Sequence, residues 1–528
     1  MDDARRVVDD GAVYVRGGLI ADVASAAAPP PDGFEGAPVV AVGGTIYPGL
    51  IELHNHLSYD ALPLWAVPER YGNRDQWGSG GRNARTYRRL ISGPMSVLGG
   101  DAELTAAVTR YVETKALIGG TTTSQGVALY SNQGITKYYS GVVRNVEQPL
   151  DAGLPAAFDR IADVVATDAS RFLTEQDAHT CLLLHLAEGT DPAARGHFES
   201  LHLPDGSWAI RPSLAGIHSV ALGAVGLQVM ADHQASVVWS PLSNLLLYGD
   251  TMDVAGAKAA DVRMGIGSDW SPSGSKNLFG ELKVARLVSR SKGGVFSDVE
   301  LLDMATRNAA GILGWDGLLG SVERNKFADL VVLAGIQGDP YDRFLSARES
   351  AIELVVIAGV PRCGRVQLMA ELGVGEGEEP LDVGAALRTL YLTDPAALPT
   401  VAALSFAQAR TRLAAALADL PGLAARMERP TAEMLTAARS PEPRWFLQLD
   451  QDEPPGIAIR PHLPGPDGRP TAETPIDLTA AAEPLSTVLQ PIELDPVTVA
   501  DDPEFLHRIE QEPNVWADVK AGLAGLYG

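Results

Sequence analysis

Between residues 48 and 325 the sequence alternates short apolar runs with longer amphipathic runs of helical period. This alternation calls for a parallel sheet whose strands are connected by helices. Eight of the apolar runs have the character of strands: IELHNH, GGTTTSQGV, GVVRNV, AFDRIADVV, CLLLHLAE, LAGIHSV, SVVWSPLSN and VRMGIGSDW. Eight strand–helix units in a segment of this length predict a (β/α)8 TIM barrel.

Short strands separated by glycine turns flank this segment on both sides. GAVYVRGGLIADVA and PVVAVGGTIYPGL precede it, and KFADLVVLAG and ELVVIAGVPRCG follow it. We therefore expect a small β-sandwich domain formed from both flanks, with the barrel inserted into it. After residue 370 the sequence becomes rich in Ala and Leu with a helical pattern, and it then becomes rich in Pro and Gly. This change indicates a separate appended region.

The predicted fold class is thus α/β, with four segments in order along the chain. They are the first part of the small β domain (1–47), the (β/α)8 barrel (48–325), the second part of the small β domain (326–370) and an acidic C-terminal extension without an assigned role (371–528).

The formal net charge of −24 bears on the expected partners. An acidic surface repels phosphate groups and anionic lipids, so we expect a small-molecule substrate and neither nucleic acid nor membrane. Two cysteines, Cys181 and Cys363, are too few for a disulfide framework, and no apolar run reaches the roughly 20 residues that span a bilayer. These features predict a cytoplasmic protein and leave a homo-oligomer open.

Two histidines separated by one residue, His54 and His56, end the first predicted strand. Side chains alternate along a strand, so both imidazoles project to the same side while Asn55 points away. Two imidazoles on one side can share a metal ion, but the same pattern also arises by chance in a barrel core. The pair alone does not decide between the two interpretations.

Three further polar residues end later predicted strands and favour the metal. His185 ends CLLLH, His218 ends LAGIH and Asp269 ends MGIGSD. The carboxyl ends of barrel strands form the face where barrel enzymes place their reactive groups. A carboxylate or an imidazole at the top of an apolar strand needs a partner, and a shared cation supplies one.

With these motifs the sequence resembles the amidohydrolase superfamily. The matching segments are PGLIELHNH, HLAEG, GIHS, GSDWS and KFADLVVL, and HLAE and SPLSN make it most similar to the deaminase and triazine-hydrolase branch. The resemblance implies four ligands of one divalent metal ion: His54, His56, His185 and Asp269. It also implies three catalytic residues: Glu188, His218 and Asp269.

One departure from the wider superfamily concerns the number of metal ions. Members with two ions bridge them with a carboxylated lysine from the fourth strand, and no lysine occurs here between Lys137 and Lys258. We therefore expect one ion per chain. Zn²⁺ is favoured, and Fe²⁺ or Mn²⁺ would also suit three histidines and an aspartate.

The expected chemistry follows from these parts. A divalent ion with an open coordination position lowers the pKa of bound water toward about 7 and so provides hydroxide. Attack on an sp² carbon that carries nitrogen leaves an amine to be protonated, and Glu188 is close enough in sequence to His185 to transfer that proton. This predicts deamination of an N-heterocyclic small molecule. The alternatives are hydrolysis of a cyclic amide or imide by the same site, and an inactive metal-binding barrel that acts as an interaction protein.

Glu188 and His218 each have a structural alternative. Glu188 would suit a helix start, where the macrodipole favours a carboxylate. A lone histidine such as His218 is often a core residue with its hydrogen bonds satisfied.

The segment after the first predicted strand, residues 68–90, contains six arginines and several aromatic residues. Loops that follow barrel strands lie over the barrel mouth, so this basic segment would attract a carboxylate-bearing substrate. A solvated helical face is the alternative. The predicted substrate contacts are Arg74, Trp77, Gln125, Asn244 and Trp270, with Tyr71 and Tyr87 as further aromatic candidates.

Overall fold

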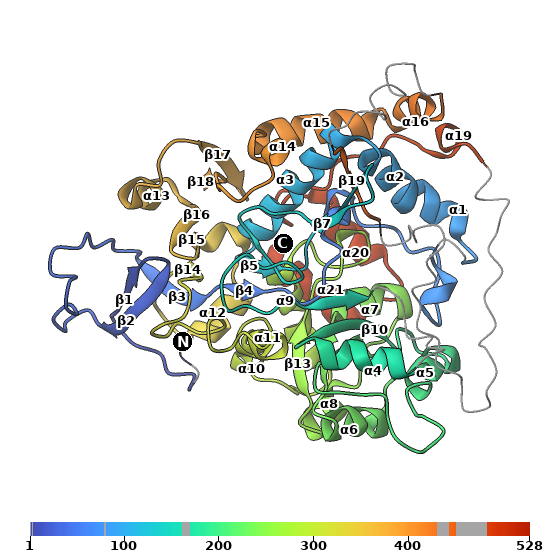
Figure 1. The fold of residues 1–528 in the computed structure, drawn as a ribbon, viewed down its shortest axis with the longest axis horizontal. Helices are drawn as coiled ribbons and strands as arrows, with labels where there is room; N and C mark the ends of the chain where they lie inside the picture. Colours follow the sequence, from blue (N-terminus) through green and yellow to red (C-terminus); the bar gives the residue numbers. More distant parts are fainter. Residues whose placement is uncertain (1, 3, 79–80, 161–168, 430–442, 450–482) are drawn as a thin grey trace.

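The computed structural model describes the chain except for residues 1, 3, 79–80, 161–168, 430–442 and 450–482 (Figure 1). Within the described residues, eight parallel strands form two sheets, ordered β13-β12-β11-β10-β9 and β4-β5-β8. They are β4 (Leu50–Ile51), β5 (Thr121–Ser124), β8 (Arg144–Asn145), β9 (Phe158–Arg160), β10 (Leu182–Leu186), β11 (Leu214–His218), β12 (Ser236–Trp239) and β13 (Arg263–Ile266). Each overlaps one predicted strand. Residues 161–165 of the fourth predicted strand lie outside the described residues.

Backbone hydrogen bonds join the two sheets at both of their edges. Ala157 N donates to Val146 O at 2.8 Å between β8 and β9, and Leu53 N donates to Ile266 O at 3.4 Å between β4 and β13. Asn55 and Asp269 form a further parallel bridge at the second edge. The strands therefore follow one another in the order of a (β/α)8 barrel. Among the described residues, the paired strands form two sheets and not one closed sheet.

The strands read as short apolar runs because both of their faces are covered. All five residues of β10 (LLLHL) and of β11 (LAGIH) are buried. Parallel strands with two covered faces lose the alternation of apolar and polar residues. The covering helices include α3 (Ala102–Ile118), α4 (Ala169–Ala178), α5 (Pro192–Glu199), α6 (Ala224–Asp232), α7 (Pro241–Tyr248), α8 (Val254–Ala259), α9 (Leu278–Ser291), α10 (Asp298–Met304) and α11 (Arg307–Leu313).

The seventh predicted strand is shorter than its sequence segment, which corrects that prediction. β12 ends at Trp239, and the residues from Pro241 onward form α7. Proline fits the first turn of a helix because its missing N–H would have no partner there. Asn244, predicted at a strand end, therefore lies in a helix.

A separate antiparallel sheet combines both flanks of the barrel segment, with the order β17-β18-β16-β15-β14-β3. Its strands are β3 (Gly44–Pro48), β14 (Leu330–Ala334), β15 (Ile352–Ile357), β16 (Val360–Arg365), β17 (Glu378–Val383) and β18 (Ala386–Tyr391), and a hairpin of β1 (Gly11–Arg16) and β2 (Leu19–Ser25) lies outside it. β3 pairs with β14, so the two flanks share one sheet. β17 and β18 lie beyond residue 370, while the division into domains stays a prediction.

The described part of the C-terminal region packs against helices of the barrel segment. α15 (Phe406–Ala418) contacts α3, where Phe406 stacks on Tyr111 with ring centroids 5.5 Å apart. α21 (Ala517–Tyr527) contacts α9, and α20 (Pro503–Gln511) contacts α21 (Figure 1). The Pro/Gly-rich text at 453–470 lies outside the described residues.

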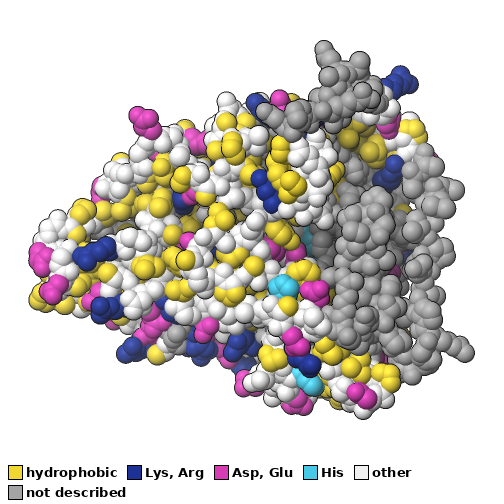
Figure 2. Space-filling model, in the orientation of Figure 1, with side chains coloured by type: hydrophobic (Ala, Val, Ile, Leu, Met, Phe, Trp, Pro, Cys, Tyr) yellow, Lys and Arg dark blue, Asp and Glu magenta, His cyan; other side chains and the backbone are white. Residues whose placement is uncertain are grey.

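The surface and the helices bear on the expected partners. Figure 2 shows acidic side chains scattered among lysines, arginines and apolar residues on one described face, so the negative charge does not gather there in one patch. None of the described helices combines the length and the apolar character required to cross a bilayer.

A buried ion pair connects the flanking sheet to the barrel, and its loss should destabilise the fold. Arg144 in β8 donates through both terminal nitrogens to Asp329, beside β14, and Asp329 also accepts from Ala358 N at 2.8 Å. Asp329→Asn should lower the free energy of unfolding by about 3 kcal/mol, because it leaves a buried guanidinium with too little opposing charge. Denaturant unfolding measures this loss.

The matched control is Asp177→Asn, which removes an exposed ion pair to Arg211. Exposed pairs contribute about 0–1 kcal/mol, so the control should unfold almost like the wild type. Similar small changes in both variants would contradict a stabilising role for the buried pair.

Candidate active site

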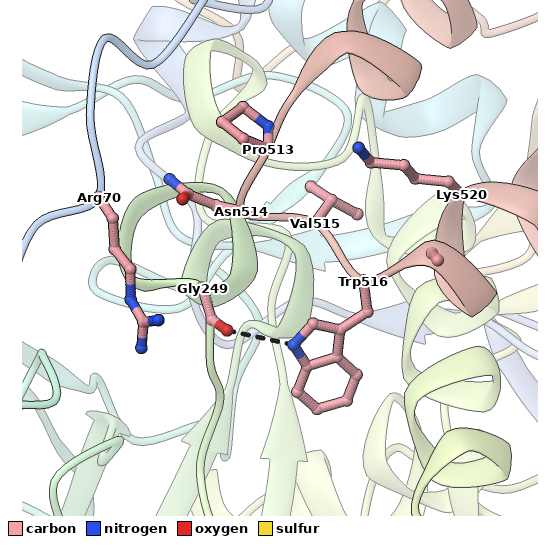
Figure 3. A pocket seen from close by; sticks show the side chains of 8 residues that line it. Arg70, Gly249, Pro513, Asn514, Val515, Trp516 and Lys520 are labelled. Atoms are coloured by element: carbon pink, nitrogen blue, oxygen red, sulfur yellow. Dashed lines mark hydrogen bonds between the residues drawn. The ribbon is translucent and has the colours of Figure 1, made fainter.

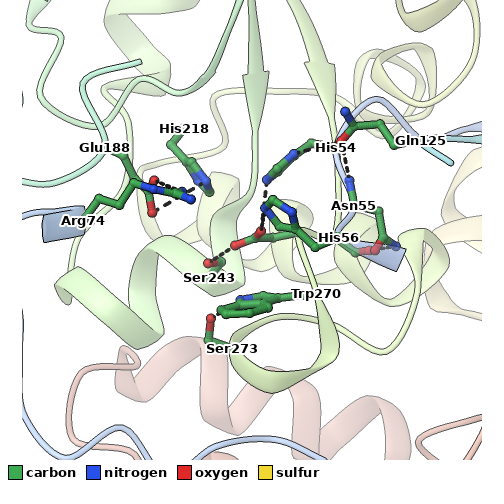
Figure 4. Close-up of polar contacts among 12 residues, drawn as sticks. His54, Asn55, His56, Arg74, Gln125, Glu188, His218, Ser243, Trp270 and Ser273 are labelled. Carbon is green, nitrogen blue, oxygen red and sulfur yellow. Dashed lines mark hydrogen bonds and ion pairs between the residues drawn. The ribbon is translucent and has the colours of Figure 1, made fainter. Parts of the chain in front are cut away.

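Six of the residues singled out in the sequence gather at the carboxyl ends of the parallel strands. They are His54, His56, His185, Glu188, His218 and Asp269. Figure 4 labels His54, His56, Glu188 and His218 among them. His54 Nε2 lies 2.9 Å from Asp269 Oδ1, and His56 Nε2 lies 3.5 Å from the same oxygen. The ring centroid of His54 is 4.7 Å from that of His185 and 5.2 Å from that of His218.

Two overlapping groups of side chains have donor atoms close enough to share an ion. One group is His54, His185 and His218, and the other is His54, His56 and Asp269. Within each group the donor atoms lie within 4.8 Å of one another. The four predicted ligands are thus divided between two groups that share His54, and His218, predicted only for catalysis, belongs to one of these groups.

Buried nitrogens without partners fit a cation at this point. Among the described residues, neither ring nitrogen of His185 has a hydrogen-bond partner, and neither does Nε2 of His218. Their exposed fractions are 2% and 0%. Burial lowers the pKa of His54 to about 4 and holds the pKa of His185 well below its usual range. Neutral imidazoles with available lone pairs are the state that metal ligands require.

Gln125 lies behind the first histidine rather than in open space. Its Oε1 is 3.1 Å from His54 Nδ1 and accepts a hydrogen bond from Asn55 N at 3.0 Å. A partner at Nδ1 orients an imidazole and directs its Nε2 toward a metal. The position of Gln125 therefore fits support of a ligand, and its predicted contact with a substrate stays a prediction.

Helix α7 supplies two partners that the sequence analysis missed. Ser243 Oγ donates to Asp269 Oδ2 at 2.5 Å, and Tyr248 OH donates to Glu188 Oε1 at 2.6 Å. Asn244, one helical turn before Tyr248, contacts His218 Nδ1 through its Oδ1 at 2.9 Å. Residues four apart on a helix share a face, so reading SPLSN as a helix would have pointed to Tyr248.

Glu188 is buried with both carboxylate oxygens engaged. Oε1 accepts from Tyr248, Oε2 accepts from Arg74 Nη1 at 2.8 Å, and Oε1 lies 3.7 Å from His218 Nε2. Burial would raise the pKa of Glu188, but the charges of His218 and Arg74 bring it below its ordinary value. Glu188 does not begin a helix, because Asp191 caps α5 instead.

The predicted substrate contacts lie against other site residues. Arg74, expected to reach a substrate carboxylate, already forms an ion pair with Glu188. Trp77 is buried and donates through Nε1 to Tyr248 OH at 2.8 Å. Trp270 is buried with its ring 5.8 Å from that of His56 and 5.7 Å from that of Trp77. The two indoles therefore form an aromatic wall beside the predicted ligands.

The buried tyrosines of the 68–90 segment pack behind this wall. Tyr87 lies 5.7 Å from Trp77 and 6.5 Å from Trp270, measured between ring centroids. Tyr71 packs on Trp65 at 6.4 Å. Direct stacking of either tyrosine on a substrate stays a prediction.

Comparison with known proteins agrees with this geometry. Residues 175–362 match the model of the amidohydrolase family. A 5-methylthioadenosine/S-adenosylhomocysteine deaminase from Nitratidesulfovibrio vulgaris is 26% identical over 371 residues, which cover 63% of this chain and 80% of that protein. One of the same name from Desulforudis audaxviator is 33% identical over 126 residues, which cover 23% of this chain and only 29% of that protein.

A solved structure of an adenosine deaminase from Xanthomonas campestris with bound zinc has a TM-score of 0.52 and 20% identity, and the match covers 68% of this chain and 89% of that one. The chain is therefore similar to the amidohydrolase family over residues 175–362, and its fold resembles that of the solved deaminase. The similar proteins carry the names of deaminases and, in one from Gordonia rubripertincta that is 27% identical over 124 residues, of an S-triazine hydrolase.

Proposed function

We propose that this protein hydrolyses carbon–nitrogen bonds other than peptide bonds and deaminates an N-heterocyclic small molecule. The observation that carries the proposal is a pair of overlapping groups of imidazole and carboxylate donors that share His54, with Glu188 beside His218. The names of the relatives, which are deaminases of adenine-containing compounds, support the same substrate class. The wall of Trp77 and Trp270 offers planar surfaces for such a ring.

We infer that one divalent ion, with zinc favoured, would be held by four residues: His54, His56, His185 and Asp269. The unpartnered nitrogens of His185 support this assignment, as does the zinc named for the Xanthomonas campestris deaminase. When bound, such an ion acts as a Lewis acid that makes water a stronger nucleophile near neutral pH. His218 would remain beside it, oriented by Asn244.

Glu188 would carry the proton between water and the leaving nitrogen. Water adds to the ring carbon that bears the amino group, and Glu188 takes the released proton. The carbon–nitrogen bond then breaks, the nitrogen receives a proton from Glu188 and leaves as ammonia, and the carbon retains the oxygen. Tyr248 and Arg74 hold the carboxylate in place during both transfers.

The eight parallel strands would close into a (β/α)8 barrel around this face. The hydrogen bonds at both sheet edges support closure, and so does the likeness to the solved deaminase fold. We keep the predicted division into a barrel, a small β domain from both flanks and a C-terminal extension.

The proposal is tested by metal analysis of the purified protein and a screen for ammonia release. The panel should contain aminated purines and pyrimidines together with cyclic amides and imides. We expect about one zinc ion per chain and ammonia from an aminated heterocycle. Ring opening of a cyclic amide without ammonia would favour the alternative reaction. Zinc-loaded protein that is inactive on the whole panel would contradict the proposed hydrolase.

Arg74 provides a test of the carboxylate-bearing substrate, which we retain as a proposal. Arg74→Ala should lower kcat/KM by about 10- to 150-fold, because a charge-assisted hydrogen bond contributes roughly 1.5–3 kcal/mol. Arg74→Lys should recover only part of the loss, since an ammonium lacks the planar pair of donors. Kinetics with two substrates that differ only in a carboxylate or its neutral amide measure the effect.

The losses of kcat/KM with the two substrates show whether Arg74 contacts the substrate. A loss confined to the carboxylate substrate would support direct recognition by Arg74. Equal losses with both substrates would assign Arg74 to Glu188 alone, as its ion pair suggests. Unchanged kinetics would contradict both roles.

A further inference from the structure

Two buried lysines near the candidate active site share one carboxylate from the C-terminal region. Lys115 on α3 donates to Asp495 Oδ2 at 2.5 Å, and Lys276, just before α9, donates to Asp495 Oδ1 at 2.7 Å. The exposed fractions of the three residues are 0%, 2% and 1%. Lys276 also pairs with Asp502 at 2.8 Å. Buried ammonium groups are tolerated only when opposing charges surround them.

Lys115 connects this carboxylate to the two loops that follow the predicted metal ligands. Its Nζ also donates to the backbone oxygen of Asp60 at 2.9 Å and to Ser271 Oγ at 2.7 Å. Asp60 lies in η1 (Leu57–Ala61), directly after His56, and Ser271 begins η4 (Ser271–Ser273), two residues after Asp269. The three hydrogens of the ammonium thus match three acceptors from three segments of the chain.

The side chain of Asp60 continues the connection toward the ligands. Asp60 Oδ1 accepts from Ser271 N at 2.7 Å, and Asp60 Oδ2 accepts from Asn55 Nδ2 at 3.2 Å. Asn55 stands between His54 and His56 and bridges to Asp269 across the barrel strands. An uninterrupted chain of polar contacts therefore runs from Asp495 to the backbone of the candidate metal centre.

The same C-terminal region holds the site from a second side. Asn514 Nδ2 donates to Leu246 O at 2.8 Å. Trp516 Nε1 donates to Gly249 O at 3.1 Å, which Figure 3 shows as a dashed line. Both acceptors lie at the end of α7, the helix that presents Tyr248 to Glu188. Asn514, Trp516 and Gly249 are among the residues that line a cavity of about 450 Å³ beside the end of α7. The C-terminal region is therefore connected to the loops that follow the predicted metal ligands, and it also contacts helix α7, which carries the partner of Glu188.

We propose that Asp495 is a positioning residue for the candidate metal centre. By fixing Lys115, it holds the loops after His56 and Asp269 at the separation at which their ligand atoms face one ion. The inference rests on the metal site of the proposed function. Outer partners of metal ligands typically contribute 10- to 100-fold to metal affinity, which sets the size of the expected effect.

The test compares zinc affinity in the full-length, zinc-loaded wild type and Asp495→Asn, by competition with a chelating dye. The amide has nearly the same shape but removes the charge that Lys115 and Lys276 share. We expect zinc binding to weaken by about 10- to 100-fold. A purely structural contact would lower the Tm and leave the zinc Kd unchanged, and that result would overturn the proposal.

Asp501→Asn is the matched control in the same segment. Its carboxylate accepts from Gly384 N at 3.1 Å and from Thr498 Oγ1 at 2.6 Å, so it supports the flanking sheet instead of Lys115. The control should keep the zinc Kd of the wild type even if its Tm falls. Equal weakening of zinc binding in both variants would also overturn the proposal, because the effect would then follow the stability of the segment.

Ser271→Ala tests the other end of the chain of contacts without changing a charge. It should weaken zinc binding in a folded protein even if Asp495→Asn fails to fold, and an unchanged Kd would contradict the proposal. Where both variants fold, the double variant should lose less than the product of the two single effects, because both act through Lys115. Weaker zinc binding in Asp495→Asn alongside an inactive wild type would support the positioning role and contradict only the proposed reaction.

Discussion

Glu188→Gln should retain bound zinc and lose about 10²- to 10⁴-fold in kcat, the usual contribution of a general acid/base group. The amide keeps the size of the carboxylate but cannot accept a proton from water and return it to nitrogen. Both Glu188 oxygens receive hydrogen bonds, from Tyr248 and Arg74, so the substituted side chain should keep its position on at least one of them. Steady-state kinetics with the best substrate from the screen, together with zinc analysis, measure the two properties separately.

Two further variants sharpen this test. Glu199→Gln lies at the exposed end of α5 and should leave kcat unchanged. Tyr248→Phe removes one donor to Glu188 and should give a smaller loss than Glu188→Gln, since the carboxylate remains. A Glu188→Gln enzyme with nearly wild-type kcat would remove Glu188 from the reaction and leave it as a buried partner of Arg74.

His54→Ala is expected to remove most of the bound metal. His54 is the residue that the two groups of donor atoms share, so its loss leaves neither group complete. Structural sites require nearly all of their ligands to bind tightly, and the remaining residues cannot enclose an ion. Elemental analysis should find about one zinc ion per wild-type chain and far less in the variant.

The control for this measurement is His507→Ala, because His507 lies on the exposed side of α20 and contacts only Gln511 among the hydrogen bonds of the described residues. Its zinc content should match the wild type. A wild-type content near two ions per chain, or unchanged zinc when His54 and His56 are both replaced by alanine, would contradict a single site built on these histidines.

The sequence predicted the strands and the cluster of polar residues because both leave local signals. A buried parallel strand is a short apolar run, and a polar side chain interrupts it near its carboxyl end, as His185 does in LLLHL. The gathering of such residues then follows from the topology. The start of α7 was missed because the apolar segment SVVWSPLSN has the composition of one long strand. Only Pro241 marks the point at which the strand gives way to the helix.

The supporting contacts could not be predicted because they join residues that are far apart in the chain. Lys115 and Asp495 are separated by 380 positions, and Tyr248 and Glu188 by 60. Neither pair leaves a periodic or spaced pattern within one segment. Arg74 is another example. Its charge suggested a contact with a substrate carboxylate, but in the fold it pairs with the carboxylate of Glu188, which is 114 positions away.

The distance between Lys115 and Asp495 along the chain also determines when this site is completed during synthesis. At roughly 5–20 residues per second, Asp495 is made about 20–75 seconds after Lys115. During that interval the ammonium groups of Lys115 and Lys276 lack their shared counter-charge and remain hydrated. Until then the loops after His56 and Asp269 lack the contact with Asp495 that they receive through Lys115 in the folded chain. Under the proposed positioning role, the metal site would be completed only after the C-terminal region has been synthesised.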